Sequence, residues 1–426
     1  MNLSHRPETY RTMGVNGPPV SHLSDLSKVP GRILDRKLVK TFRLDICLVE
    51  EQFEMVRYVE KGRNPHWGYF PREGHPEEVT RFDGTKITPV FLQAIAYEVY
   101  VKNVTFGLLH QWLGDMGMTV SENTLRNWLK KGKKYLDRMV VELKRMALEK
   151  DAVVNCDETW CKVRKYDHYK KCYMWVMVNK AERVVIFFYE DGSRGRDVLT
   201  NFLGDAELKA LMSDGYNVYV FIGDELKTDR YKDTDHQVRL AHVRAKFVKA
   251  RMEGGDKRAD VFLENINLLF RFEREYDREM LTDVERTRRR RGTPTMEAMI
   301  NLRANLLREL KSEEEQKSCY MREALNYLHK FWKEAFTYIK DGRYPISNNL
   351  AERAVRPFTT KRKNSLHFGS DEGAEIAAVY HSVISTVKLQ GRSTWDYLGK
   401  FFTGIFNGCR DFLSLAPQNI DLVVCQ

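Results

Sequence analysis

The chain has 426 residues, enough for two or three domains, and 42% of them are hydrophobic, which excludes an intrinsically disordered protein. Its formal net charge at pH 7 is +11, which favours a polyanionic partner such as nucleic acid. No apolar run reaches the ~18 residues that a membrane helix needs, and the N-terminus lacks the apolar core of a signal peptide. We therefore expect a cytoplasmic protein without a membrane segment.

The first 82 residues predict two segments. Residues 1–40 contain Pro, Gly and Ser with little periodicity and predict an irregular arm. Residues 41–82 alternate apolar and polar residues, which predicts a small β-rich segment whose core Trp67, Tyr69 and Phe70 would close. The alternative is a solvent-facing aromatic patch for a partner. The seven cysteines are scattered without a CxxC pair, so we expect reduced thiols and no structural zinc.

Residues 85–150 change to helical spacing. Two amphipathic stretches flank a turn at Gly117, and Ser121 or Glu122 begins the second, an arrangement typical of a helix-turn-helix. In that motif the second helix enters the major groove of DNA. The alternative interpretation of this segment is a helical module with a purely structural role. The motif would place Glu122, Asn123, Arg126 and Asn127 near base edges, Lys130, Lys131, Lys133 and Lys134 near phosphates, and Leu125, Trp128 and Leu129 in the core.

The next segment changes from helical to strand-like periodicity. The runs AVVNCDETW, YMWVMVNK and VVIFFYE predict three strands, and a helix (RDVLTNFLGD) and a fourth strand (LKALMSDGY) follow. Each run is apolar nearly throughout, as in a sheet buried on both faces. This order is that of a ribonuclease H-like sheet, so the predicted fold class is α/β, with residues 151–250 as the first part of the core.

Two acids follow predicted strands. Asp157 and Asp214 each come at the C-terminal end of an apolar run, where open α/β sheets place their sites. If the two strands are neighbours, the carboxylates face each other and repel unless a cation lies between them. Mg²⁺ suits this place because it takes hard oxygen ligands. The alternative is that each acid is a solvated strand end.

A long helical region separates these acids from the third one. Residues 241–250 predict a basic amphipathic helix whose Arg244 and Lys246 are candidate DNA contacts. Residues 251–340 are almost entirely helical in pattern and predict an insertion into the sheet domain. The arginine run RTRRRRG within it predicts a solvated loop with incidental phosphate affinity.

The third acid lies in the stretch SNNLAERAVRPF. Ser347 is a good N-cap, and we expect the helix to end before Pro357. Glu352 lies one turn from both Asn348 and Arg356, and a basic tail, TTKRKNS, follows. A carboxylate beside phosphate-binding charge suits metal-dependent chemistry on nucleic acid. The alternative is a surface helix with a Glu352–Arg356 ion pair.

Four segments resemble a known family: DETW at Asp157, SDGY around Asp214, AHVRAKF, and DGRYPISNNLAERAVRPFTTKRKNSLHFGSDEGAE. Together they are similar to the D-D-E transposases of the bacterial insertion-sequence family sixty-six, from the helix-turn-helix to Leu398. The resemblance assigns the catalytic and metal-binding roles to Asp157, Asp214 and Glu352. It implies a ribonuclease H-like catalytic domain with a large helical insertion.

The resemblance also implies an activity and partners. The activity is cleavage and strand transfer at the ends of a mobile element, with two Mg²⁺ (or Mn²⁺) ions per active site and no other cofactor. The expected partners are double-stranded DNA of the terminal inverted repeats and of the target, further copies of the chain, and small accessory proteins at the bacterial nucleoid.

Asn348 and Asn349 would orient Glu352, and phosphate contacts would come from Arg353, Arg356, Lys361, Arg362 and Lys363. Residues 341–412 would complete the core, and residues 413–426 form a tail.

The chain departs from the family pattern at its N-terminus. GRNPHWGYFPREG stands where a zinc ribbon with paired cysteines is expected. Three alternatives to a transposase stay open: a ribonuclease H-like nuclease or resolvase that cuts without joining, a non-catalytic DNA-binding regulator derived from a transposase, and a structural or assembly protein.

Overall fold

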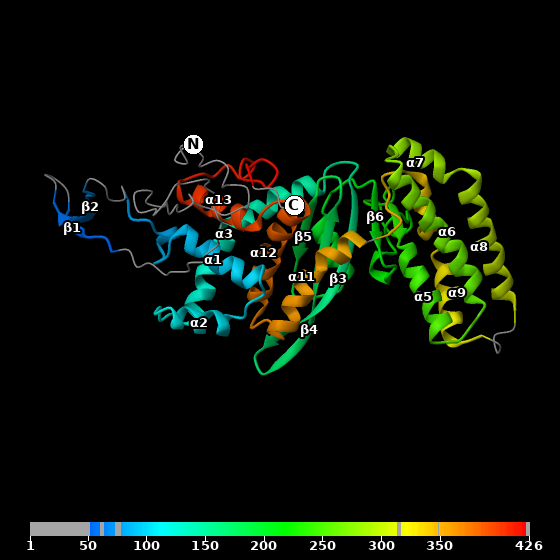
Figure 1. Cartoon of the computed structure of the whole chain (residues 1–426), viewed down its shortest axis with the longest axis horizontal. Helices are drawn as coiled ribbons and strands as arrows, with labels where there is room; N and C mark the ends of the chain where they lie inside the picture. The colour runs from blue at the N-terminus through cyan, green and yellow to red at the C-terminus, as the bar shows by residue number, and fades with distance from the viewer. Residues whose placement is uncertain (1–51, 60–63, 73–77, 313–316, 348, 423–426) are drawn as a thin grey trace, which may run out of the picture. The chain divides into compact units, whose positions relative to one another are not determined.

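The computed structural model describes residues 52–59, 64–72, 78–312, 317–347 and 349–422 (Figure 1). The expectations for residues 1–40, for the start of the β-rich segment, for Asn348 and for the side chain of Asn349 lie outside what is described. None of the described helices is long and apolar enough to cross a membrane.

A five-stranded mixed sheet forms the centre of the described chain, in the order β5-β4-β3-β6-β7. The strands are β3 (Val153–Lys165), β4 (His168–Asn179), β5 (Val184–Phe188), β6 (Ala210–Ser213) and β7 (Asp235–Val238). Strand β3 is antiparallel to β4 and parallel to β6, which is parallel to β7. The four predicted strands are present, whereas β7 was not predicted because its sequence, DHQV, contains one apolar residue.

Strand β3 is longer than predicted. Asp157 is its fifth residue of 13, so the expectation that the strand ends at this acid is wrong. Beyond Asp157 the strand continues with buried Cys161 and Val163 alternating with exposed Lys162 and Arg164, the period-two pattern of a strand with one covered face. The parallel pairing with β6 nevertheless stops at Asn155, which lies opposite Met212.

Helices cover both faces of the sheet (Figure 1). On one face α11 (Asn349–Ser365) and α12 (Asp371–Leu389) bury Ala351, Phe358 and Ala378 against β3, β4 and β5. Helix α12 also holds the backbone of edge strand β5, because the Thr386 hydroxyl accepts from Val185 N at 3.0 Å. On the other face, the apolar side of α4 (Arg196–Leu203) packs in a cluster that includes Trp175 and Ile186.

Helix α11 continues through Pro357, so the predicted end of this helix is wrong. A proline inside a helix removes one backbone hydrogen bond and costs about 3 kcal/mol. Here Ala351 before it and Phe358 after it are both fully buried against the sheet, and this packing offsets the cost. The basic sequence TTKRKNS therefore lies on a helix and not on a tail.

The helices before the sheet are α1 (Pro89–Tyr100), α2 (Phe106–Asp115) and α3 (Glu122–Ala147). Leu125, Trp128 and Leu129 are buried as predicted, and Ser121 caps α3 by accepting from Thr124 N at 3.2 Å. Helix α3 is continuous over 26 residues.

Two terminal expectations are corrected. Strands β1 (Met55–Tyr58) and β2 (His66–Tyr69) form a two-stranded sheet, but Trp67 is 63% and Phe70 57% exposed, because two such short strands cannot enclose them. At the other end, Leu415, Ala416 and Leu422 of the expected tail are buried in the core that also contains α13 (Thr394–Phe406).

The helical insertion has a core of its own. Phe247 and Phe262 stack at 4.5 Å between ring centroids, within a cluster that includes Leu302 and Leu325. Its helices are α5 (Leu240–Met252), α6 (Ala259–Arg278), α7 (Asp283–Arg290), α8 (Thr293–Lys311), α9 (Cys319–Lys330) and α10 (Trp332–Phe336). Short 3-10 turns lie at Phe82–Gly84, Asn217–Tyr219 and Thr337–Lys340.

The arginine run in the insertion is not the solvated loop that the sequence suggested. It forms most of α7, and Arg290 at its end is 1% exposed. Two Arg290 nitrogens contact the Glu273 carboxylate at 2.8 and 2.7 Å, and a third donates to the carbonyls of Tyr338 and Asp341. A buried guanidinium is stable only with such partners, so Arg290 has a structural role.

Candidate active site

The two predicted aspartates lie at the same edge of the sheet. Asp214 directly follows β6, and Asp157 lies two residues beyond the last residue of β3 that pairs with β6. The turn after β6 is held by Asp214 itself, whose carboxylate accepts from Tyr216 N at 2.9 Å. The Asp157 carboxylate accepts from Glu158 N, also at 2.9 Å.

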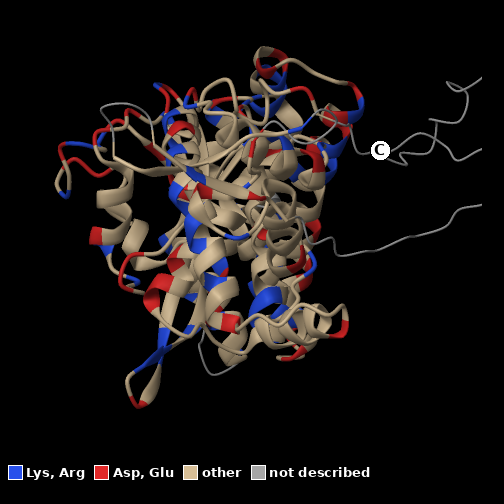
Figure 2. Ribbon diagram, turned by 90° about the vertical axis from the view of Figure 1, so that its left-hand side faces the viewer, with Lys and Arg blue, Asp and Glu red and all other residues tan. Residues whose placement is uncertain are grey.

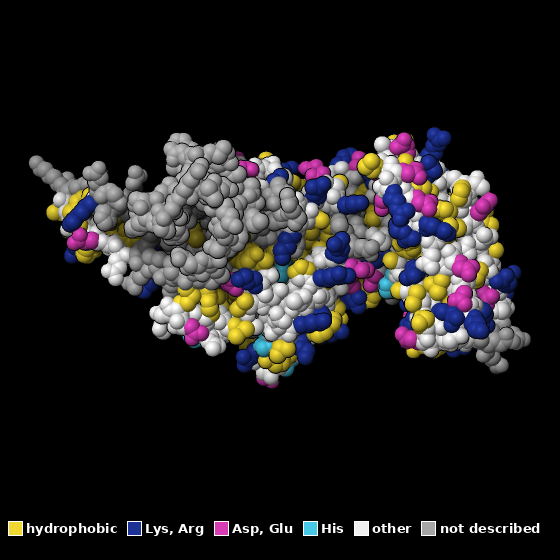
Figure 3. Space-filling view, viewed as in Figure 1, with side chains coloured by type: hydrophobic (Ala, Val, Ile, Leu, Met, Phe, Trp, Pro, Cys, Tyr) yellow, Lys and Arg dark blue, Asp and Glu magenta, His cyan; other side chains and the backbone are white. Residues whose placement is uncertain are grey.

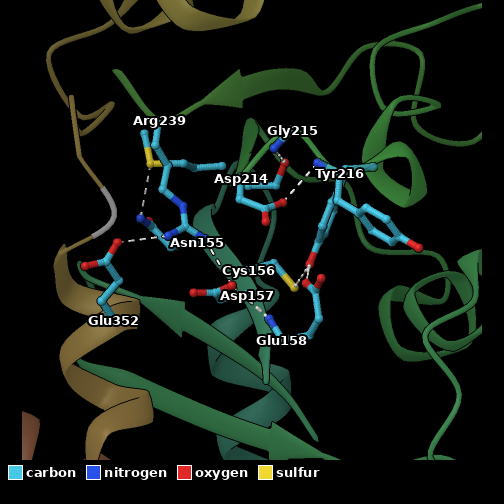
Figure 4. A network of polar contacts seen from close by, with 12 residues as sticks. Asn155, Cys156, Asp157, Glu158, Asp214, Gly215, Tyr216, Arg239 and Glu352 are labelled. Atoms are coloured by element: carbon cyan, nitrogen blue, oxygen red, sulfur yellow. Dashed lines mark hydrogen bonds and ion pairs between the residues drawn. The ribbon is translucent and has the colours of Figure 1, made fainter. Parts of the chain in front are cut away.

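Arg239 connects Asp157 with the third predicted acid, Glu352 (Figure 4). It comes directly after β7, and its side chain is 6% exposed. One terminal nitrogen lies 3.0 Å from an Asp157 oxygen, and the other lies 3.0 Å from an oxygen of Glu352, which reaches in from α11. Burial lowers the pKa of Arg239, but the charges of Asp157, Asp214 and Glu352 outweigh burial and raise it.

Asp157 has an energetically costly negative charge. Its side chain is 18% exposed, and burial raises its pKa to about 6 although Arg239 opposes the shift. The neighbouring charges of Glu158 and Asp214 raise the pKa further. This edge of the sheet therefore concentrates negative charge that favours a bound cation.

Glu158, which the sequence analysis overlooked, supports both aspartates. Its side chain is 2% exposed. It accepts from Arg194 Nε at 2.8 Å and from the Tyr219 hydroxyl at 2.6 Å. The Arg194 guanidinium lies 3.7 Å from the centre of the Tyr216 ring, so Glu158 ties β3 to the turn that carries Asp214. A signal was present in the sequence, because an acid inside an apolar strand needs a buried partner.

The insertion contacts the turn at Asp214. The Tyr327 hydroxyl on α9 donates to the Asp214 carbonyl. Gly215 has a φ of +79°, and a Cβ atom there would lie 2.6 Å from the Tyr327 oxygen. Both the backbone conformation and the space therefore require glycine at this position of the SDGY sequence.

The residues of this site are of the chemical type that binds a divalent cation. Asp157, Asp214 and Glu352 offer the carboxylate oxygens that Mg²⁺ or Mn²⁺ takes, and Arg239 shows that the place between them binds positive charge. As the side chains stand, no group of three or more His, Cys, Asp or Glu residues in the described ranges could hold a metal ion. The guanidinium is held incompletely, because its Nε has no hydrogen-bond partner within the described chain.

The predicted phosphate contacts on α11 divide into two groups. Arg353, Arg356 and Lys363 are exposed, and none of them takes part in an ion pair among the residues described. Arg362 instead donates to the Trp160 carbonyl at 2.7 Å, and its guanidinium lies 4.1 Å from the centre of the Trp160 ring.

Lys361 was wrongly predicted as a phosphate contact. It is 4% exposed, and its amine donates to the carbonyls of Val99 at 2.9 Å and Val104 at 3.1 Å. Burial lowers its pKa to about 8. Lys361 lies one turn after buried Phe358, so it follows the apolar side of α11 and anchors that helix to the end of α1.

The candidate contacts elsewhere have partners within the chain. Three of them form ion pairs: Arg126 with Glu122 at 2.6 Å, Lys246 with Glu323 at 2.6 Å, and Lys130 with Glu372. The other two form hydrogen bonds of 2.6 Å, in which Lys131 donates to the Asp83 carbonyl and Arg244 donates to the Asn267 side chain. Exposed pairs of this kind contribute about 0–1 kcal/mol and exchange readily for phosphate. DNA contact by these residues stays a prediction.

Comparison with known proteins gives the family. The sequence model described as "Transposase IS66 family" matches residues 84–376. The uncharacterized protein y4jD of Sinorhizobium fredii (strain NBRC 101917 / NGR234) is 26% identical over 253 residues, which are 56% of this chain and 47% of that protein. The uncharacterized protein y4qI of the same strain is 26% identical over 239 residues, which are 55% of this chain and 43% of that protein.

The chain thus spans about half the length of these relatives. Because the family model matches more than half of its residues, the chain belongs to the IS66 transposase family.

Proposed function

We propose that the chain is a DNA transposase that catalyses metal-dependent strand cleavage and strand transfer at the ends of a bacterial insertion sequence. One observation carries this proposal. Three acids that are 57 and 138 residues apart in the sequence act on a single guanidinium, that of Arg239, at one edge of the sheet. Family membership supports the same activity.

The topology also supports the proposal. The central strand has two strands on its antiparallel side and two on its parallel side, which is the order of a ribonuclease H-like sheet. The helical insertion lies between β7 and the helix that carries Glu352. Helices α2 and α3, joined by a tight turn at Gly117, suit the predicted helix-turn-helix.

In this reaction Asp157, Asp214 and Glu352 would hold two Mg²⁺ or Mn²⁺ ions. Bound ions of this kind lower the pKa of an attacking water or 3′-hydroxyl and stabilise the leaving oxygen. The protein keeps the carboxylates in place through the Glu158–Arg194 pair and through Tyr327. Without metal ions, Arg239 partly compensates the charges of Asp157 and Glu352.

Exposed cations on α11 would position the substrate. Arg353, Arg356 and Lys363 lie on the same helix as Glu352 and are available to bind phosphates beside the cut. The substrates would be the double-stranded terminal inverted repeats and target DNA, bound by several copies of the chain, with small accessory proteins, at the nucleoid.

The test uses a duplex that carries one end of the element, with the strand to be transferred labelled at its 5′ end, together with an unlabelled target duplex. With Mg²⁺ we expect cleavage and transfer of the label into the target. Glu352→Gln should bind the DNA but neither cut nor join it. Glu375→Gln is the matched control, because Glu375 is an exposed glutamate on the neighbouring helix α12.

Two outcomes would contradict the proposal. Cleavage without transfer of the label would identify a nuclease or resolvase. Near-normal joining by Glu352→Gln would remove Glu352 from the mechanism.

A further inference from the structure

The sheet extends beyond β5 and β6 as a two-stranded ribbon, to which Phe368 adds a single bridge at Val163. Strand β4 pairs with β5 only from Trp175 onward, and β3 pairs with β6 only up to Asn155. Between these limits β3 and β4 continue together, in register from Thr159 opposite Met174 to Lys165 opposite His168. Figure 1 shows this hairpin extending below the rest of the sheet, and Tyr166 at its tip is fully exposed.

The two faces of the hairpin differ. One face carries Cys161, Val163 and Cys172, all 0% exposed in a cluster that includes residues of α11. The opposite face is more exposed, although the Tyr169 ring lies 4.6 Å from the His367 ring and the Arg194 guanidinium lies 5.2 Å from the centre of the Tyr173 ring. It carries three cross-strand pairs, which we call the basic hairpin face: Trp160 opposite Tyr173, Lys162 opposite Lys171, and Arg164 opposite Tyr169.

The like charges on this face reduce the stability of the hairpin. Lys162 lies directly opposite Lys171, and like charges in that position destabilise a sheet. No ion pair in the described part of the chain involves Lys162, Arg164 or Lys171, although Lys165 on the covered face pairs with Asp371. Lysines can also protect an edge strand from aggregation, but that purpose does not require two of them to face each other.

Exposed aromatic rings alternate with these cations. Trp160 is 40% and Tyr169 54% exposed. Figure 2 shows Lys and Arg along the hairpin, and in Figure 3 hydrophobic, His and Lys or Arg side chains lie together at its lower end. Interleaved cations and aromatic rings are typical of surfaces that bind phosphates and stack unpaired bases.

The basic hairpin face begins three residues beyond Asp157 on β3 but on the opposite face of that strand, because Asp157 shares the alternation of buried Cys161 and Val163. At about 3.3 Å per residue, Trp160 lies about 10 Å and Arg164 about 23 Å along β3 from Asp157. Arg362 links the start of the face to α11, because it donates to the Trp160 carbonyl and covers one side of the Trp160 ring. To reach this face, DNA cut at Asp157 would cross the edge of β3 beyond Asn155, where the pairing with β6 ends, and would then follow the hairpin for about 3–7 nucleotides at 3.4 Å each.

We propose that the basic hairpin face is a DNA-binding surface that holds the DNA beside the cut. Lys162, Arg164 and Lys171 bind its phosphates, and Tyr169 and Trp160 stack on bases that become unpaired there. This inference rests on the proposed function, because it takes the substrate to be DNA, and it adds the surface and the form of DNA that the surface recognises.

The first test removes the opposed charges with Lys162→Thr/Lys171→Thr. The matched control, Lys180→Thr/Lys232→Thr, removes two exposed lysines, one of them at the other end of β4. Binding of a labelled DNA duplex is measured across a salt series in a Glu352→Gln background, so that no cleavage interferes.

The hairpin variant should weaken binding and reduce the slope of log K against log salt by about 2, since each phosphate contact contributes about 0.9. The control should keep the slope. Thermal unfolding of the hairpin variant should occur at the same or a higher temperature, because a repulsion is removed and Thr suits strands. An unchanged slope, or an equal fall in the control, would overturn the proposal.

The second test addresses the stacking. Tyr169→Leu keeps apolar bulk but removes the ring, and binding is compared between a blunt duplex and the same duplex with a short unpaired fork. We expect about a five- to tenfold loss for the forked DNA and little loss for the blunt one. An equal loss for both would overturn the role in stacking.

These tests separate the inference from the proposed function. If the chain cuts and joins DNA but the hairpin variant binds normally, only the inference fails. If no variant binds DNA above the level of an unrelated basic protein, the proposed function fails as well.

Discussion

Two charged regions on opposite faces of β3 differ in how their charges are paired. In the candidate active site, Arg239 pairs with Asp157 and Glu352, and the charge of Asp214 also acts on it. On the basic hairpin face, cations stand opposite one another with no acidic partner in the described ranges. Both arrangements reduce stability, and a sequence that keeps such arrangements is expected to use them for function.

A third charged region shows that charge alone does not mark a functional site. Arg290 and Glu273 are as buried as Arg239, yet every nitrogen of Arg290 has a partner. By contrast, the Nε of Arg239 has none among the described residues. The difference between a structural and a functional charge therefore lies in how completely its partners satisfy it.

The comparison predicts the largest effect for an acid that pairs with Arg239. Asp157→Asn should reduce DNA cleavage at least about a thousand-fold, equivalent to about 4 kcal/mol, because it removes a carboxylate from the metal site. Cleavage of a labelled DNA end measures the loss. The control is Asp167→Asn, the same substitution at the exposed tip of the hairpin, and similar losses in both variants would contradict the assignment.

The same substitution should stabilise the fold. The pKa of Asp157 is raised by burial from 3.8 to about 6, so its favourable contribution is complete below about pH 4 and is lost as the pH rises through about 6. A difference between 3.8 and about 6 corresponds to about 3 kcal/mol. Without divalent ions, Asp157→Asn should therefore unfold at a higher temperature than the native protein at pH 7.5.

That gap should close below pH 4, where Asp157 is protonated in both the folded and the unfolded chain. Glu375→Gln, an exposed control, should show no such gap. Equal unfolding temperatures at pH 7.5 for Asp157→Asn and the native protein would mean that Arg239 compensates the Asp157 charge fully.

Arg239 itself should compete with metal. Arg239→Gln removes the cation that lies 3.0 Å from both Asp157 and Glu352. The affinity of the DNA-free protein for Mn²⁺ should rise at least about tenfold, because nearby unit charges interact by about 1–4 kcal/mol. Titration calorimetry with Mn²⁺ measures this rise. Arg353→Gln, an exposed arginine beside Glu352, is the control, and a weaker affinity in Arg239→Gln would show that Arg239 supports the metal site.

Sequence reasoning located the three acids because apolar strands and short motifs are local signals. It missed Arg239, because β7 has polar residues at three of its four positions and was not recognised as a strand. His236 and Gln237 are nevertheless buried. Burial of polar residues depends on partners that are distant in sequence, which periodicity cannot reveal.

The errors on α11 have a similar cause. Pro357 and Lys361 both favour solvent or a helix end when read locally. Contacts with the sheet and with the end of α1 decide their actual positions. The basic hairpin face was hidden for another reason, since the strand appeared to end at Asp157, and the alternation of Lys162 and Arg164 with apolar residues was not used.

The smallest expected effect tests the opposed lysines directly. Lys171→Glu would place a carboxylate opposite Lys162, and opposite charges in that position contribute about 0.2–1 kcal/mol. The variant should unfold at a slightly higher temperature and bind DNA more weakly. Lys170→Glu makes the same charge change opposite Val163, where no lysine faces it, so it should not gain stability. If only Lys171→Glu gains stability and loses DNA affinity, the repulsion between Lys162 and Lys171 accompanies DNA binding by this face. If neither variant gains stability, solvent already screens that repulsion, and the contrast with the acids around Arg239 is smaller than the geometry indicates.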